Sequence, residues 1–175
     1  MKYRFQTLIV SGVVLVSPMA LAHDHSLTTG FVAGLLHPIT GIDHLFALML
    51  AGFFIGRQRS SQWIAISGLL LALGSGAAGG QLLGAQAWTE AAVLLSLPLF
   101  LAMQLLKHRC IVSLAVLTMS LLMFAHGWSH GVEGAAMNTG FVVGLLMMST
   151  AVLSLFSLIG RAAMSGSSTV SHAHR

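Results

Sequence analysis

Apolar residues fill most of this chain in five long runs that short polar breaks separate. A helix needs about 20 residues to cross the hydrocarbon core of a bilayer, and each run reaches or approaches that length. The first and last runs are longer, which leaves room for a tilt or a break. The pattern predicts an all-α fold, a polytopic membrane helix bundle with about five transmembrane helices. The five runs are 28–55, 62–85, 90–106, 111–127 and 138–160.

A shorter apolar stretch precedes these runs and has the three parts of a secretory signal. A basic start with Lys2 and Arg4 leads into an apolar core and then into the small-residue cleavage site Ala20-Leu21-Ala22. An uncleaved first transmembrane helix is the alternative. We expect a cleavable signal peptide over residues 1–22, a transmembrane helical bundle over 23–164 and a polar cytoplasmic tail over 165–175.

Basic residues gather in alternate loops and so predict the orientation of the chain. Arg57 and Arg59 follow the first run, and Lys107 and Arg109 follow the third. The loops after the second and fourth runs carry neither Lys nor Arg. Because basic loops stay on the cytoplasmic side, the mature N-terminus is predicted to be periplasmic and the C-terminus cytoplasmic. Cleavage of a signal peptide requires the same orientation.

The composition supports a membrane setting and excludes several other classes of protein. Hydrophobic residues make up 56% of the chain and charged residues only 7%, whereas a soluble domain carries about 25% charged residues. The net charge of +4 comes from scattered residues, so no basic face exists for a nucleic acid. A single cysteine excludes a Cys-rich zinc site. No phosphate-binding glycine motif is present, so neither ATP nor an organic cofactor is expected.

A polar island, HPITGIDH, interrupts the first apolar run at residues 37–44. Ionisable side chains are costly inside a membrane segment and mark ion pathways or binding sites. In an unbroken helix His37 and His44 would lie about 10 Å apart along the axis, too far for one ion to bridge. A break near Pro38–Gly41 would fold His37 back towards Asp43 and His44. Discontinuous helices of this kind build ion sites in transporters.

A second polar island, HGWSHGVE, lies at residues 126–133 near the end of the fourth run. Its two histidines are four residues apart and its glutamate follows three residues later, so all three share one face of a continuing helix. Two imidazoles and a carboxylate suit a borderline divalent ion. We expect the islands to meet in the outer half of the membrane. The predicted metal ligands are His37, Asp43, His44, His126, His130 and Glu133.

Two further histidines would follow the cleavage site directly. Cleavage after Ala22 would begin the mature chain with His23-Asp24-His25. An amino terminus with histidine at the third position can wrap a square-planar Cu(II) or Ni(II) ion through the amine, two amides and the imidazole. A terminus without any metal role is the alternative. We therefore add His23 and His25 to the predicted metal ligands, outside the membrane site.

A short internal echo relates the first and fifth runs. The sequence TGFVAGLL at 29–36 recurs as TGFVVGLL at 139–146. Both copies would enter the membrane from the same face. Each holds two glycines four residues apart, which let helix backbones approach closely. Either an ancient duplication or a shared mode of helix packing explains the echo.

Together, the two islands resemble the HupE/UreJ family of nickel permeases. The motifs are His-x5-Asp-His in the first run and His-Gly-x2-His-Gly-x-Glu in the fourth, and the resemblance spans most of the chain. One departure is Ala125, which separates Phe124 from the first histidine where the family motif has the two adjacent. The resemblance implies uptake of Ni(II), with Co(II) as an alternative cargo, across the cytoplasmic (inner) membrane of a bacterium. The nickel would serve hydrogenase or urease maturation.

These observations predict a permease, not an enzyme, that uses the membrane potential. Its partners would be a divalent transition-metal ion, the lipid bilayer, and either a second copy of the chain or a periplasmic or outer-membrane metal supplier. One alternative is an intramembrane metal-dependent hydrolase, in which the ion would activate water. The other is a metal-binding or haem-binding structural subunit of a membrane complex.

Overall fold

The computed structural model describes residues 30–58, 61–106, 109–133 and 139–170, without the side chains of residues 109–111, 133 and 165–170. The described residues form six α-helices with short connections and include no strand, which confirms the predicted all-α bundle. The predicted signal peptide lies outside the described residues. The helices are α2 (Phe31–Thr40), α3 (Ile42–Arg57), α4 (Gln62–Leu83), α5 (Ala87–Met103), α6 (Arg109–Glu133) and α7 (Thr139–Val170).

Each of the five apolar runs contains a helix, and the first contains two, but these helices differ in length. Among the described residues, α4, the Val112–Val132 part of α6 and the Thr139–Met164 part of α7 are each long and apolar enough to cross a membrane. The bent pair of α2 and α3 makes a fourth span if it is counted as one. Helix α5 is apolar but has 17 residues. Length and composition therefore support three or four spans, whereas the sequence predicts about five. The difference arises at α5, which is shorter than the other candidate spans.

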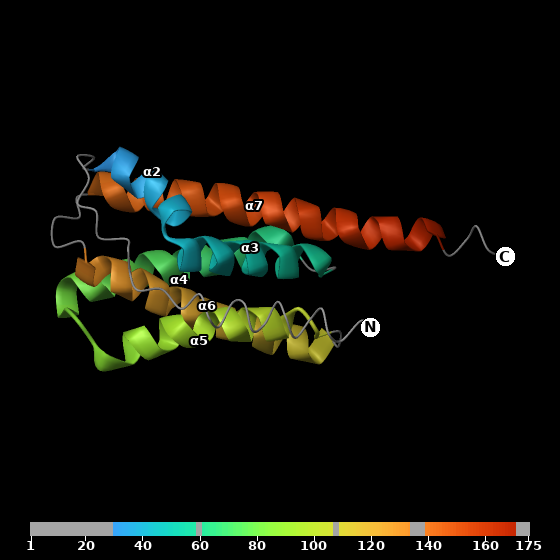
Figure 1. Ribbon diagram of the computed structural model, residues 1–175, viewed down its shortest axis with the longest axis horizontal. Coiled ribbons are helices and arrows are strands. Elements are labelled where there is room, and N and C mark those ends of the chain that lie inside the picture. Colours follow the sequence, from blue (N-terminus) through green and yellow to red (C-terminus); the bar gives the residue numbers. More distant parts are fainter. Residues whose placement is uncertain (1–29, 59–60, 107–108, 134–138, 171–175) are drawn as a thin grey trace.

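The helices lie side by side along the long axis of the molecule (Figure 1). One end of the bundle carries the starts of α2, α5 and α7 and the ends of α4 and α6 (Figure 1). Helix α7 continues to Val170, into the stretch that the sequence assigned to the polar tail. Large apolar side chains such as Ile64, Leu71 and Leu82 are exposed on the sides of the bundle, as expected where the surrounding solvent is lipid.

The first apolar run is broken at Gly41, as the sequence predicts. Helices α2 and α3 meet there at a bend of 78°. Gly41 itself is extended, with φ −79° and ψ 97°, and its N–H donates to the carbonyl of His37 at 3.0 Å. Pro38 lies inside α2 and is buried. The chain thus turns three residues after the proline, at the glycine.

The two copies of the echo pack against each other, through α2 and the start of α7 (Figure 1). A Cβ atom added to Gly34 would overlap the backbone carbonyl of Phe141, and one added to Gly144 would overlap that of Phe31. These two contacts are reciprocal, because each glycine faces the phenylalanine at the third position of the other copy. Both copies thus meet the same requirement for close backbone packing, whether or not they arose by duplication.

Helices α4 and α6 also approach at backbone distance. A Cβ atom added to Gly127 would overlap the carbonyl of Leu73, and one added to Gly131 would overlap that of Ala77. Each of these glycines directly follows one of the two histidines of α6. The face of α6 that carries these two glycines thus packs against α4. This contact fixes the rotation of α6 about its axis.

Buried apolar side chains fill the bundle between the polar islands and the end that carries Arg57. They come mainly from α3 and α6, with two each from α4 and α5 and one from α7. Below the two islands the bundle is therefore packed with apolar side chains. This core comprises Ala47, Leu48, Ala51, Phe54, Ile55, Ile66, Leu69, Phe100, Met103, Ala115, Met119, Leu122, Met123 and Leu153.

Candidate metal centre

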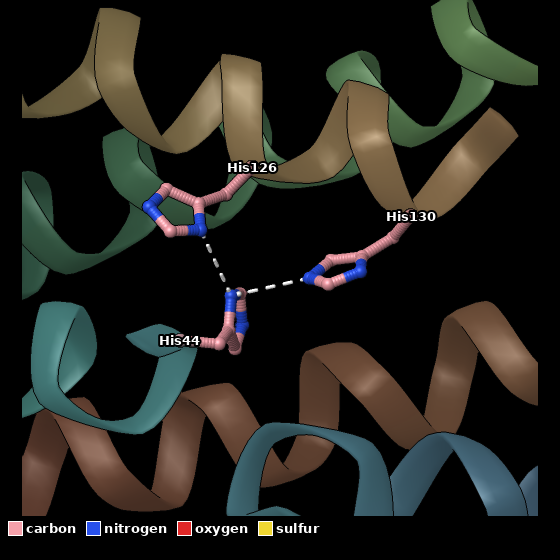
Figure 2. A group of neighbouring side chains, drawn as sticks. All are labelled: His44, His126 and His130. Carbon is pink, nitrogen blue, oxygen red and sulfur yellow. Dashed lines mark hydrogen bonds between the residues drawn. The ribbon is translucent and has the colours of Figure 1, made fainter. Parts of the chain in front are cut away.

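Three histidines from the two islands converge inside the bundle. Nδ1 of His44 lies 3.4 Å from Nδ1 of His126 and 3.2 Å from Nε2 of His130. Figure 2 shows the two α6 rings aimed at the ring from α3. One nitrogen from each residue lies within 4.8 Å of the other two. The predicted meeting of the islands is confirmed for these three residues.

Local structure explains why the three rings meet. His44 belongs to the first turn of α3, directly after the bend at Gly41. His126 and His130 are one turn apart on α6, so their side chains leave the helix on the same face. His44 and His126 are each only 1% exposed, whereas His130 is half-buried. The expected shared face of α6 is thus present, and it points into the bundle.

Two of the three nitrogen separations match those around a bound ion. A histidine nitrogen binds Zn²⁺ at about 2.0–2.1 Å, so two such ligands lie about 2.9 Å apart at a right angle and about 3.4 Å apart at the tetrahedral angle. The observed 3.2 and 3.4 Å fall in this range. Nε2 of His44 is buried and has no hydrogen-bond partner among the described residues. A buried polar atom of this kind is a common mark of a site for an ion or water.

His37 lies beside this group, and its ring is in hydrogen-bond contact with that of His130. Its Nε2 is 2.8 Å from Nδ1 of His130, the ring nitrogen opposite to the one that faces His44. The break at Gly41 thus brings His37 and His44 to the same neighbour, His130. His37 is half-buried and is not one of the three grouped histidines. Its role as a ligand remains a prediction.

The other predicted ligands are less closely placed. Asp43 is half-buried in the first turn of α3 and is not part of the described three-histidine group. Successive helical residues point about 100° apart, so its carboxylate cannot share the direction of the His44 ring. Glu133 ends α6, but its side chain lies outside the described ones, and His23 and His25 also lie outside them. Metal binding by these four residues remains a prediction.

A serine on α5, which the sequence did not single out, joins the site. Ser96 is fully buried, and its Oγ lies 2.8 Å from Nε2 of His126. The same hydroxyl donates to the carbonyl of Val93 at 2.7 Å. A single hydroxyl in an otherwise apolar stretch of α5 was the available signal, but serine is common in membrane helices and does not by itself identify a site.

Comparison with known proteins gives one family for this chain. A sequence profile of the family described as HupE / UreJ protein matches residues 11–174. Protein HupE of Rhizobium leguminosarum bv. viciae is 29% identical over 153 residues, which cover 83% of this chain and 78% of that protein. No solved structure matches the chain. The family match covers nearly the whole chain and includes both histidine islands, so this chain belongs to the HupE/UreJ family.

Proposed function

We propose that this chain is a permease that takes up Ni(II), with Co(II) as an alternative cargo, across the bacterial inner membrane. The nickel would serve hydrogenase or urease maturation, as membership of the HupE/UreJ family implies. The observation that carries the proposal is the convergence of His44, His126 and His130 within a membrane bundle. The family consists of metal transport and accessory proteins, not enzymes, which argues against an intramembrane hydrolase.

The donor set suits a transported nickel or cobalt ion. Neutral imidazoles bind borderline divalent ions such as Ni(II) and Co(II) well. Three histidines leave coordination positions open, and an ion held in this way can exchange ligands, unlike one in a closed structural site. A divalent charge in an apolar bundle also needs compensation. Asp43 and Glu133, two of only four acidic residues in the chain, are the nearest candidates in sequence for that role.

The histidines form a path of increasing burial. His37 and His130 are half-buried, and His44 and His126 are almost fully buried. His37 contacts one ring nitrogen of His130, and His44 contacts the other. An ion entering from the outer face would meet His37 first, then pass to His130 and on to the buried pair. His23 and His25 would capture ions before this step, on the periplasmic side.

Beyond the buried pair the bundle is closed in this conformation. On the face of α3 that bears His44, the following residues Leu48, Ala51 and Ile55 are at most 1% exposed. Met119 and Met123 occupy the corresponding part of α6 and are fully buried. Release to the cytoplasm therefore requires these helices to separate, in the manner of alternating access. The Arg57 end of α3, where basic residues predict the cytoplasmic face, is the end that would open.

The membrane potential suffices as a driving force. One elementary charge gains about 2.3 kcal/mol per 100 mV, so a divalent ion gains about 4.6 kcal/mol. At about 1.4 kcal/mol per factor of ten, this supports a concentration ratio of more than about a thousandfold. A nucleotide-driven step is unnecessary for a trace nutrient.

The geometry disfavours the haem-binding alternative. A haem with two histidine ligands holds its porphyrin ring between the two imidazoles. Here the imidazoles contact one another directly, at 3.2 and 3.4 Å. The ring centroids of His44 and His130 are only 4.7 Å apart. There is space between these rings for a small ion but none for a porphyrin.

The proposal is tested by nickel uptake into proteoliposomes with an inside-negative potential. Wild-type protein should accumulate radioactive nickel, and a variant with His37, Asp43 and His44 all replaced by alanine should fall to the level of empty vesicles. Ser149→Ala, which removes a fully buried hydroxyl without a described hydrogen-bond partner, is the matched control. Uptake by the triple variant at the wild-type rate would refute the proposal. Competition with Co(II), Cu(II) and Zn(II) would identify the preferred ion.

A further inference from the structure

Ser96 makes two short hydrogen-bond contacts from a position with no access to solvent. Its Oγ lies 2.7 Å from the carbonyl oxygen of Val93 and 2.8 Å from Nε2 of His126. The side chain is 0% exposed, and His126 is 1% exposed. Helix α5 therefore adds a fourth element to a site whose histidines come from α2, α3 and α6.

The hydroxyl of Ser96 carries one hydrogen, and this limits how the two contacts can be made. A backbone carbonyl can only accept, so the contact with Val93 uses the serine hydrogen. Oγ can then only accept from His126, which requires the hydrogen of the imidazole to be on Nε2. In the neutral ring the other nitrogen, Nδ1, is left with a free lone pair. That nitrogen is the one that faces His44 at 3.4 Å.

This arrangement prepares His126 to bind a metal ion. An imidazole binds through a nitrogen that carries no hydrogen, and ligand histidines usually donate their other N–H to a neighbouring acceptor that fixes the tautomer. We infer that Ser96 is a positioning residue that holds His126 in the Nε2–H tautomer, so that Nδ1 is available to the ion. The inference rests on the proposed function, because it assigns His126 as a ligand of the transported ion.

The environment makes the hydroxyl hard to replace. Water cannot readily substitute for a fully buried side chain between α5 and α6, so removal of Oγ would leave Nε2 of His126 without an acceptor. The His126 hydrogen would then have no fixed position, and the tautomer that blocks Nδ1 would be populated. Loss of such an outer partner lowers metal affinity by about tenfold to a hundredfold.

The test compares Ser96→Ala with Ser149→Ala and Ser96→Thr in purified protein. Equilibrium Ni(II) binding should weaken by about tenfold to a hundredfold in Ser96→Ala and remain unchanged in Ser149→Ala, which loses an equally buried hydroxyl on α7. Ser96→Thr keeps a hydroxyl and should restore binding. Nitrogen NMR of histidine-labelled, metal-free protein, with the His126 signals assigned from His126→Gln, should show the Nε2–H tautomer in the wild type and a mixture in Ser96→Ala.

Two results would overturn the inference. One is a wild-type His126 that carries its hydrogen on Nδ1, and the other is a folded Ser96→Ala protein with wild-type affinity and an unchanged tautomer. A wild-type protein that binds no nickel would instead overturn the proposed function, and the metal-free NMR measurement would still decide whether Ser96 sets the tautomer. The two failures are thus distinguishable.

Discussion

Nδ1 of His44 lies 3.4 Å from Nδ1 of His126, although 82 positions separate the two residues in the chain. The contact joins the first turn of α3 to the first residue of the second island on α6. Both residues are almost fully buried, so this pair of nitrogens is shielded from water and faces few competing partners. An ion between them would gain two neutral ligands at once.

Replacing His44 should abolish high-affinity nickel binding. His44→Gln keeps a side chain of similar size but removes the imidazole that both α6 histidines contact. We expect affinity to fall by more than about a hundredfold, beyond the range seen for outer partners of metal ligands, and uptake to fall to background. Equilibrium binding to purified protein is the measurement. His108→Gln, in the basic loop between the third and fourth runs, is the control and should bind as the wild type does.

Replacing His37 should have a smaller effect on affinity and a clear effect on rate. His37 contacts Nδ1 of His130, the ring nitrogen that does not face His44, and lies outside the three-histidine group. We expect His37→Gln to weaken binding by about tenfold to a hundredfold, as for an outer partner, and to slow the initial rate of uptake. Parallel binding and uptake measurements separate the two effects. A loss of affinity as large as that of His44→Gln would instead identify His37 as a direct ligand.

Alanine should have different effects at three glycines. At Gly127 the new Cβ would overlap the carbonyl of Leu73, so α6 must shift, at a cost of about 1–3 kcal/mol. At Gly68 nothing lies within 4 Å, and alanine should be neutral or stabilising by up to about 1 kcal/mol. At Gly41 the Cβ would find only ordinary contacts, the nearest at 3.4 Å. Thermal unfolding in detergent measures the effect of each substitution on stability, and equilibrium nickel binding measures its effect on the site.

The Gly41→Ala variant tests whether the bend between α2 and α3 requires glycine. Its φ of −79° is open to any residue, so Gly41→Ala should keep the bend and most of the nickel affinity. A large loss of nickel affinity in Gly41→Ala, with no change in unfolding temperature, would mean that alanine, a strong helix former, removes the bend and joins α2 and α3 into one straight helix. Gly127→Ala, in contrast, should lower both the unfolding temperature and the affinity, because the α4–α6 contact orients both α6 histidines.

Sequence patterns predicted the parts of this site that depend on local geometry. The spacing of His126 and His130 determines a common helical face wherever the helix runs, and a proline followed by a glycine within a helical run predicts a break close by. The contact between Ser96 and His126 could not be predicted, because it depends on how α5 packs against α6. The exact position of the bend, at Gly41 and not at Pro38, also depends on packing, since Pro38 is buried within α2.

The partner of each glycine pair could likewise not be read from the chain. Matching glycines in the two copies of the echo predicted close helix packing but not that the copies would be each other's partners. That Gly34 faces Phe141 and Gly144 faces Phe31 follows from the parallel course of α2 and α7 in the folded bundle. The sequence likewise could not predict that His130 contacts both His37 and His44. These contacts depend both on the bend at Gly41 and on the position of α6 in the folded bundle.

Acidification should weaken nickel binding. Protons compete with the ion for imidazole nitrogens, and histidines in general become protonated as the pH falls through about 6.5. Binding needs the neutral form, so affinity should be highest at neutral pH and decline below about pH 6. Equilibrium binding to purified protein, measured without a gradient, avoids any contribution from proton-coupled transport. His108→Gln, which lies outside the predicted ligand set, should leave the profile unchanged, and a binding curve independent of pH would argue against histidine ligation.

Removal of the membrane potential should reduce nickel accumulation without affecting nickel binding. Proteoliposomes with a potassium gradient and valinomycin hold an inside-negative potential, and equal potassium on both sides removes it. Accumulation should fall from an excess inside to equality with the outside concentration, because a divalent ion loses about 4.6 kcal/mol of driving force per 100 mV. Equilibrium binding in detergent, which involves no gradient, serves as the control. Accumulation that persists at zero potential but disappears when a proton gradient is removed would show that protons, and not the membrane potential, drive transport.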